Sequence, residues 1–147
     1  MRELKFRAWD KKRNVWVHKE FNLFGEIVLM GELLTREGDD SRISLSELND
    51  IAVMQFTGLK DKNGKEIYEG DICRHRTITD EGVFTDDWGI TEIWFHKGCF
   101  LTRYFAFPVY SFCGRAEAEI EVIGNIYENQ ELLGESGILK TQGEKEV

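Results

Sequence analysis

Two pairs of cysteine and histidine are the residues of this chain whose types and spacing could do chemistry. Cys73 and His75 are separated by one residue, so their side chains would share one face of a strand. His96 and Cys99 follow further along, and the four residues together form the pattern Cys-x-His…His-x-x-Cys. Thiolate and imidazole ligands of these types could hold a tetrahedral zinc ion if the strands brought them together.

The spacing of the first pair argues against zinc. Ordinary structural zinc sites place their cysteines in a knuckle such as Cys-x-x-Cys, which the segment from Cys73 to His75 lacks. The residues therefore predict a buried thiol at Cys73 and surface imidazoles at His75 and His96. We expect no bound metal and no cofactor.

No other group of residues predicts catalysis. Cys99 and Cys113 have no local support that would activate a thiolate, and neither a nucleophile elbow nor a P-loop is present. Glu117, Glu119 and Glu121 alternate along a predicted strand, about 7 Å apart, which is too far for one ion without further ligands. These carboxylates are expected to form a solvated face, and the protein is not expected to be an enzyme.

Basic residues gather in two short segments that could contact nucleic acid. One segment is a predicted loop and the other a predicted hairpin; their cations are Lys11, Lys12 and Arg13, and Lys60, Lys62 and Lys65. The chain as a whole carries a net charge of −8, and residues 76–147 hold 6 cations against 13 carboxylates. A polyanion needs cations at the protein surface, so this charge balance makes nucleic-acid binding a less favoured function than binding of a protein partner.

The elements that must position these residues are mainly strands. Apolar and polar residues alternate over residues 4–18, which predicts a β-hairpin. Asp61 to Gly64 separate two apolar segments, and Gly64 can close a tight turn between antiparallel strands. Further strands are predicted at Ile27–Leu34, Ile72–Ile78, Val83–Trp88, Ile90–Phe95, Phe100–Phe105 and Ala116–Val122, with a helical turn within Asn125–Leu133.

Short strands with glycine and asparagine turns predict an antiparallel barrel or sandwich. We expect one mainly β domain over residues 1–133, with an N-terminal part (1–54) that contributes a hairpin extension and a barrel part (55–133). Residues 134–147 have few apolar groups and are expected to form a disordered tail. The longest apolar window, Ile27–Leu34, is far short of the about 20 residues that cross a bilayer.

Three segments resemble the YopX family of bacteriophage and prophage proteins. They are Lys5–Asp10, Gln55–Ile72 and Glu121–Asn129. The resemblance implies a mainly β fold with a small SH3-like barrel, and a bacterial cytoplasm reached through a phage or prophage gene. It implies no catalytic residues. Cys73 and Gln130 depart from the family pattern, which usually has an aliphatic residue and often a proline at these positions.

Within these segments the polar and glycine residues predict turns rather than chemistry. Glycine allows backbone conformations that a Cβ would obstruct, and an aspartate can accept backbone N–H bonds in a turn. The residues with this structural role are Gly58, Asn63, Gly64, Gly70, Asp71 and Gly124.

The function favoured by these observations is a phage-associated, non-enzymatic protein-interaction module that binds another protein or a second copy of itself. An aromatic-rich stretch, Phe100 to Phe112, supplies either core packing or a surface for such a partner. The alternatives are a nucleic-acid-binding phage regulator and, below it, a zinc protein or an enzyme. Three cysteines without close pairing fit a reducing cytoplasm, and no membrane segment is expected.

Overall fold

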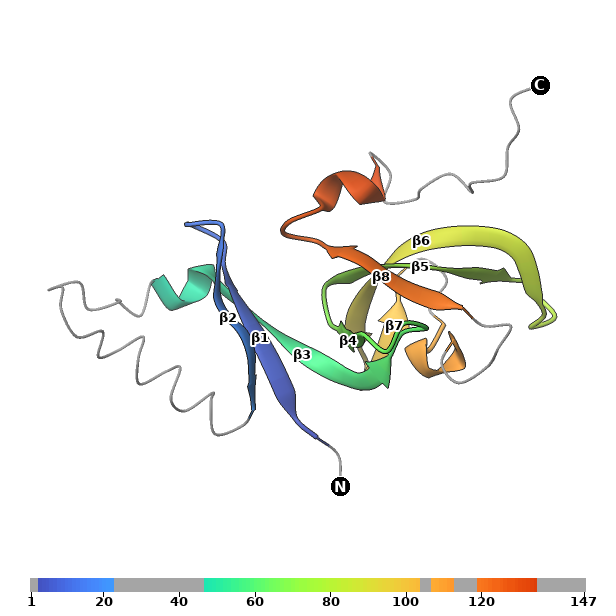
Figure 1. Cartoon of the computed structure of the whole chain (residues 1–147), viewed down its shortest axis with the longest axis horizontal. Coiled ribbons are helices and arrows are strands. Elements are labelled where there is room, and N and C mark those ends of the chain that lie inside the picture. The colour runs from blue at the N-terminus through green and yellow to red at the C-terminus, as the bar shows by residue number, and fades with distance from the viewer. Residues whose placement is uncertain (1–2, 23–46, 104–106, 113–118, 135–147) are drawn as a thin grey trace, which may run out of the picture. The chain divides into compact units, whose positions relative to one another are not determined.

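A computed structural model describes residues 3–22, 47–103, 107–112 and 119–134 (Figure 1). These residues form eight β-strands and three 3-10 turns of four residues each. The predicted strand at Ile27–Leu34 and residues 135–147 of the predicted tail lie outside the described residues. The chain divides into two compact units, Met1–Phe56 and Thr57–Val147.

The first unit is built on an antiparallel hairpin. Strands β1 (Lys5–Asp10) and β2 (Val15–Asn22) pair with each other, and β1 also pairs with the first half of β3 (Ile51–Lys60). The turn η1 (Glu47–Asp50) immediately precedes β3. The buried apolar side chains of this unit come from β1 and β3, and they are Ala8, Trp9, Met54 and Phe56.

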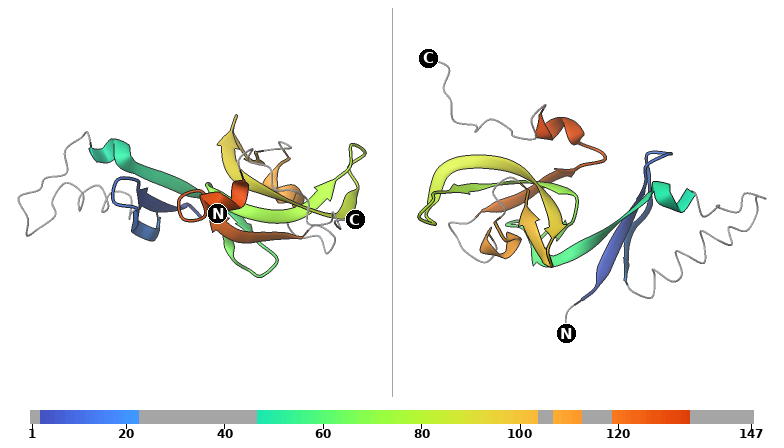
Figure 2. Two further views of the ribbon diagram at one scale, coloured as in Figure 1. Left: turned by 90° about the horizontal axis from the view of Figure 1, so that it is seen from above. Right: turned by 180° about the vertical axis from the view of Figure 1, so that it is seen from behind.

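The second unit is a curled antiparallel sheet. Its strands are β5 (Asp71–Ile78), β6 (Phe84–His96), β7 (Cys99–Thr102) and β8 (Ile120–Asn125), in the order β7-β6-β5-β8. The long strand β6 bends strongly and makes the sheet a half-barrel (Figures 1 and 2). Strand β4 (Glu66–Tyr68) lies next to β3. The turns η2 (Val109–Phe112) and η3 (Gln130–Leu133) complete the described part of this unit.

The concave side of the half-barrel holds the core of the second unit. Its buried residues are Ile67, Cys73, Ile93, Val109, Phe112 and Ile120. Partly buried apolar side chains, among them Leu59, Phe84 and Phe100, pack around them. The 3-10 turn η2 therefore closes the concave side, because it contributes two of the six core side chains.

Strand β6 differs from the prediction, which had separate strands at Val83–Trp88 and Ile90–Phe95. The two predicted strands are one continuous strand through Gly89. Gly89 is buried opposite His75, where an added Cβ would make ordinary van der Waals contacts with Thr77 and the imidazole ring. The strand continues through Gly89 because the residues on both sides of it pair with β5.

The prediction of a mainly β fold is confirmed. The described residues form two antiparallel sheets, and their helical content is limited to 3-10 turns. None of these turns has the length or the apolar character needed for a helix that crosses a bilayer.

Candidate functional site

Strand β5 separates two chemically different surfaces. Cys73 and His75 point to the concave side, where their exposed fractions are 0% and 1%, respectively. Arg74 and Arg76 alternate with them and are partly exposed on the opposite side. On β5, the two residues selected from the sequence for chemistry are therefore inside, and two arginines that were not selected are outside.

His75 is a core residue, so the prediction of a surface imidazole at this position is wrong. Its Nδ1 lies 2.7 Å from the carbonyl oxygen of Arg76, and its ring centroid is 4.6 Å from that of Phe112. Because a carbonyl oxygen only accepts, Nδ1 carries the hydrogen of the neutral ring. Nε2 is buried without a hydrogen-bond partner in this structure. Burial lowers the pKa of His75, against the smaller opposing effect of the Arg76 carbonyl.

The structure does not bring the four zinc candidates together. Cys73 pairs with Thr91 across the sheet, and His96 lies five residues further along β6, about 16 Å away along the strand. His96 and Cys99 are a directly opposite pair at the β6–β7 turn, and both are exposed. Within the described ranges, no group of three or more His, Cys, Asp and Glu side chains could hold a metal ion.

Trp88 is the centre of a cluster of cations on the convex side. The guanidinium carbons of Arg74 and Arg76 lie 4.6 and 4.5 Å from its ring centroid, and Lys62 Nζ lies 5.6 Å away. Strand register explains the position of the two arginines. Arg76 pairs directly with Trp88, and Arg74 lies two residues before Arg76 in β5, so both side chains are on the same face of the strand. All three distances are within the range of cation–π attraction.

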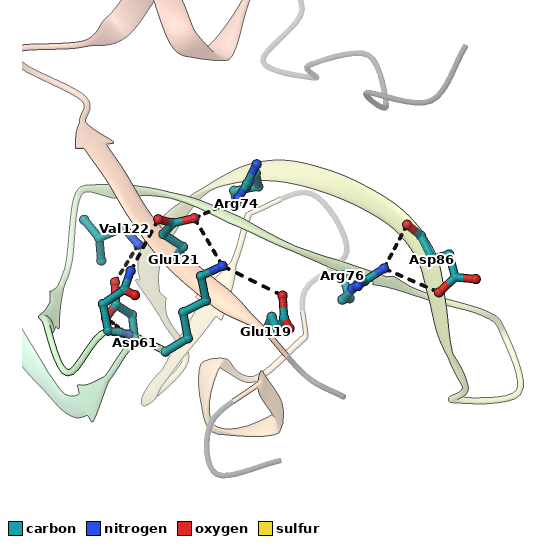
Figure 3. A network of polar contacts seen from close by, with 9 residues as sticks. Asp61, Arg74, Arg76, Asp86, Glu119, Glu121 and Val122 are labelled. Carbon is teal, nitrogen blue, oxygen red and sulfur yellow. Dashed lines mark hydrogen bonds and ion pairs between the residues drawn. The ribbon is translucent and has the colours of Figure 1, made fainter. Parts of the chain in front are cut away.

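Carboxylates from β6, β8 and the residue before β8 lie beside the cations of this cluster (Figure 3). Arg74 donates to Glu121 at 2.9 Å, and the two residues pair directly across β5 and β8. Lys62 Nζ lies farther away, 3.6 Å from Glu121 and 3.8 Å from Glu119. Arg76 donates at 3.0 Å to the backbone oxygen of Asp86 and lies 3.5 Å from its fully exposed carboxylate. Only one of these ion pairs is therefore short.

A second stack of aromatic and cationic groups lies further along β6. The guanidinium carbon of Arg103 is 4.3 Å from the ring centroid of Trp94, and the ring of His96 stacks on Trp94 with a centroid distance of 4.5 Å. Arg103 also donates twice to Glu92, at 2.7 and 3.0 Å. This hydrogen bonding with Glu92 raises the pKa of Arg103 and keeps the guanidinium charged.

We call the convex surface that carries both stacks the outer face. Its side chains, which are charged or aromatic except for one isoleucine, come from β5, β6, β8 and the neighbouring loops. They are Lys62, Arg74, Arg76, Asp86, Trp88, Ile90, Glu92, Trp94, His96, Arg103, Glu119 and Glu121. Sequence reasoning did not single out Trp88, Trp94, Arg74 or Arg76. Their alternation with the buried residues of β5 and β6 is the signal that could have found them.

The predicted basic cluster belongs to two different units. Lys11, Lys12 and Arg13 form the turn between β1 and β2, where the Asp10 carboxylate accepts hydrogen bonds from two backbone N–H groups of the turn at 2.9 Å. Burial alone would raise the pKa of Asp10, but these bonds and the Arg13 guanidinium together lower it. Lys60, Lys62 and Lys65 lie around the β3–β4 turn, and Lys62 faces the carboxylates described above.

Most of the predicted turn residues lie in turns or tight contacts, whereas Gly58 lies within strand β3. Gly58, Gly64 and Gly70 have φ values between 80° and 85°. Asp71 accepts the backbone N–H of Tyr68 at 2.7 Å, and Asn63 donates its own N–H to Asp61. Gly124 is required for a different reason, since a Cβ there would lie 2.5 Å from the side chain of Asn129.

Asp61 is a structural residue that the sequence reasoning did not single out. Its Oδ1 accepts the backbone N–H groups of Asn63 and Lys65 at 2.8 and 2.9 Å, which closes the turn. Its Oδ2 accepts the backbone N–H of Val122 at 3.0 Å, and Lys62 N–H donates to Ile120 O at 3.0 Å. One buried carboxylate therefore fastens the β3–β4 turn to the edge of β8, which brings Lys62 to the outer face.

The half-barrel and the outer face define a mainly β protein with an exposed surface of tryptophan, arginine and carboxylate groups. The model of the family described as YopX protein matches residues 5–134. The chain belongs to the YopX family.

The chain is similar to solved structures of two bacterial proteins. The crystal structure of protein EF1440 from Enterococcus faecalis is 24% identical, with a TM-score of 0.53, and the match covers 88% of this chain and 97% of that chain. The crystal structure of protein yopX from Bacillus subtilis is 20% identical, with a TM-score of 0.45, and the match covers 87% and 96%. No curated protein matches the sequence significantly.

Proposed function

We propose that this chain is a non-enzymatic protein-interaction module whose binding surface is the outer face. The observation that carries the proposal is the Trp88 cluster, in which a partly exposed indole is surrounded by three cations. Tryptophan and arginine are the residues most enriched among those that dominate the binding energy of protein interfaces. A surface that concentrates both types on one rigid sheet suits this role.

The burial of Cys73 and His75 supports a non-enzymatic role. The Cys73 thiol and the His75 imidazole are enclosed by apolar side chains, which keeps them away from any substrate in solution. A catalytic nucleophile or base has to reach its substrate within hydrogen-bonding distance. Both groups serve the packing of the half-barrel instead.

A nucleic-acid-binding role has weaker support. Lys62 and Arg13 each lie within 4 Å of a carboxylate, and counterion release requires cations that are free to neutralise phosphates. A filter-binding assay at low salt tests this role, because affinity that falls as salt rises would favour it over a protein partner.

Membership of the YopX family supports a wider proposal about context. We infer that the protein is phage-associated and acts in the cytoplasm of a bacterial host, and that the half-barrel is a variant of the SH3-like barrel. The specific biological role would follow from the identity of the partner.

Capture of partners from bacterial lysate with three forms of the full chain tests the proposed surface. The forms are the wild type, Trp88→Ala, and Tyr110→Ser as a matched control. Tyr110 is a highly exposed aromatic residue on η2, which packs on the concave side. The proposal expects Trp88→Ala to lose proteins that the wild type and Tyr110→Ser both retain. Equal capture by all three forms, or loss only with Tyr110→Ser, would rule out the outer face as the binding surface.

A further inference from the structure

The charge pattern of the outer face indicates which kind of partner it binds. This inference rests on the proposed function, in which the outer face is a binding surface. We propose that the outer face binds the outer face of a second copy of this chain, in a two-fold symmetric contact. The chain carries a net charge of −8, so two copies repel each other at most relative orientations. A contact between copies therefore requires a surface on which this repulsion is absent.

The outer face is such a surface. It carries four cations (Lys62, Arg74, Arg76 and Arg103) and four carboxylates, so its net charge is zero. In the rest of the described second unit (57–103, 107–112 and 119–134), three cations stand against nine carboxylates. The acidic charge of this unit is thus concentrated away from the outer face, and two outer faces can approach each other without net repulsion.

Both signs of charge are also available for exchange between copies. In a two-fold contact the same surface faces itself, so each cation of one copy can meet a carboxylate of the other only if the face carries both signs. Arg76 lies 3.5 Å from the carboxylate of Asp86, whose side chain is fully exposed, and Lys62 lies 3.6 Å or more from its partners. Such long, exposed ion pairs are weak, so their exchange for pairs across the contact costs little.

An acidic partner fits this face less well. Each cation of the outer face already has a carboxylate nearby, and the net charge of the chain repels an acidic molecule at long range. A basic partner would be attracted by the chain as a whole but would meet four cations on this face. Only a partner with the same mixed pattern matches it, and a second copy has that pattern.

The size of the outer face indicates how tightly two copies should associate. The twelve side chains that define it are about half of the 20–30 residues that each side of a standard interface contributes. We therefore expect a weak dimer with a dissociation constant on the order of 10–100 µM. Trp88 would be close to the centre of the contact, with its cations and carboxylates around it.

Sedimentation velocity of the full chain over concentrations up to about 1 mM, well above the expected dissociation constant, tests this inference. The variants are Arg76→Glu, Asp86→Arg and, as a control, Lys12→Glu, which makes the same change of net charge as Arg76→Glu on an exposed turn of the first unit. Arg76→Glu makes the outer face acidic and Asp86→Arg makes it basic. Each variant alone is expected to weaken self-association more than about tenfold, because like charges face each other across the contact.

An equimolar mixture of Arg76→Glu and Asp86→Arg is expected to associate again, and Lys12→Glu is expected to behave as the wild type. A wild type that stays monomeric, reversal variants that associate as the wild type does, or a mixture that stays monomeric would each overturn the inference. Monomeric behaviour together with Trp88-dependent capture of another protein would refute the second copy as partner and leave the proposed function intact.

Discussion

The two sides of strands β5 and β6 carry different residue types for different purposes. On the concave side, Cys73 and His75 are buried among apolar side chains and have no access to solvent. On the convex side, Arg74 and Arg76 stack on Trp88 and remain partly exposed. Neighbouring residues of one strand therefore have different roles: those facing the core stabilise the fold, and those facing solvent can contact a partner.

This comparison shows that residue type alone is a poor guide to chemistry on a half-barrel. Cysteine and histidine at i and i+2 form a candidate metal site only if that face is accessible. Here that face is buried in the core, where the His75 imidazole packs against the ring of Phe112. Arginine and tryptophan residues that are far apart in a sequence do not indicate a shared site, yet the fold brings three cations close to one indole ring.

The largest expected effect is on the concave side. Ile93→Ala removes a fully buried side chain of β6 and leaves a cavity in the core. We expect the free energy of unfolding to fall by about 2–5 kcal/mol. Urea denaturation measures the loss, and Ile93→Val, which removes one methyl group, should lose only about 0.5–1.5 kcal/mol. Equal, small losses for both variants would mean that the concave side is not tightly packed.

Asp61 and Asp86 compare a buried carboxylate with an exposed one. Asp61→Ala leaves three backbone N–H groups without their acceptor, and we expect a loss of about 2–3 kcal/mol in the free energy of unfolding. Asp86→Ala should change it by less than about 0.5 kcal/mol, because its ion pair is exposed. Hydrogen exchange of the Val122 amide provides a local readout: it should become faster in Asp61→Ala only. Unchanged exchange in that variant would contradict the role of Asp61.

His75 predicts a pH dependence of stability. Its pKa in the folded protein is lowered from 6.5, so the unfolded chain binds the proton more readily. The free energy of unfolding should therefore fall as the pH falls below 6.5.

Urea titrations at several pH values measure this dependence. The variant His75→Leu should lose it, while His96→Gln, a change on the outer face, should keep it. The same slope in His75→Leu and in the wild type would show that the buried imidazole does not titrate on unfolding.

Small effects are expected from substitutions of cations on the outer face. Arg76→Ala removes one cation from Trp88 and an exposed ion pair with Asp86. We expect the free energy of unfolding to change by less than about 1 kcal/mol, and the change to shrink as salt is added. Parallel urea denaturation of Arg76→Ala and Ile93→Ala shows whether the two sides differ. A larger loss for Arg76→Ala would remove the distinction between a packing side and a binding side.

The sequence predicts the fold better than the site, for physical reasons. Alternation of apolar and polar residues records which side chains are buried, and it led to the mainly β fold that the structure shows. The division of β6 into two predicted strands at Gly89 was wrong, because the pairing with β5 that continues through this residue cannot be seen in the local sequence. The Trp88 cluster was missed for a similar reason, since Lys62, Arg76 and Trp88 come from three separate segments. Only the pairing of strands brings them together.

Oxidative footprinting of side chains in the free and the associated protein tests the central claim most directly. The claim is that the outer face, and not the concave side or the β1–β2 turn, contacts the partner. We expect Trp88 to become protected from oxidation on association, with Tyr110 labelled equally in both states. Protection of Tyr110 with unchanged labelling of Trp88 would contradict the account.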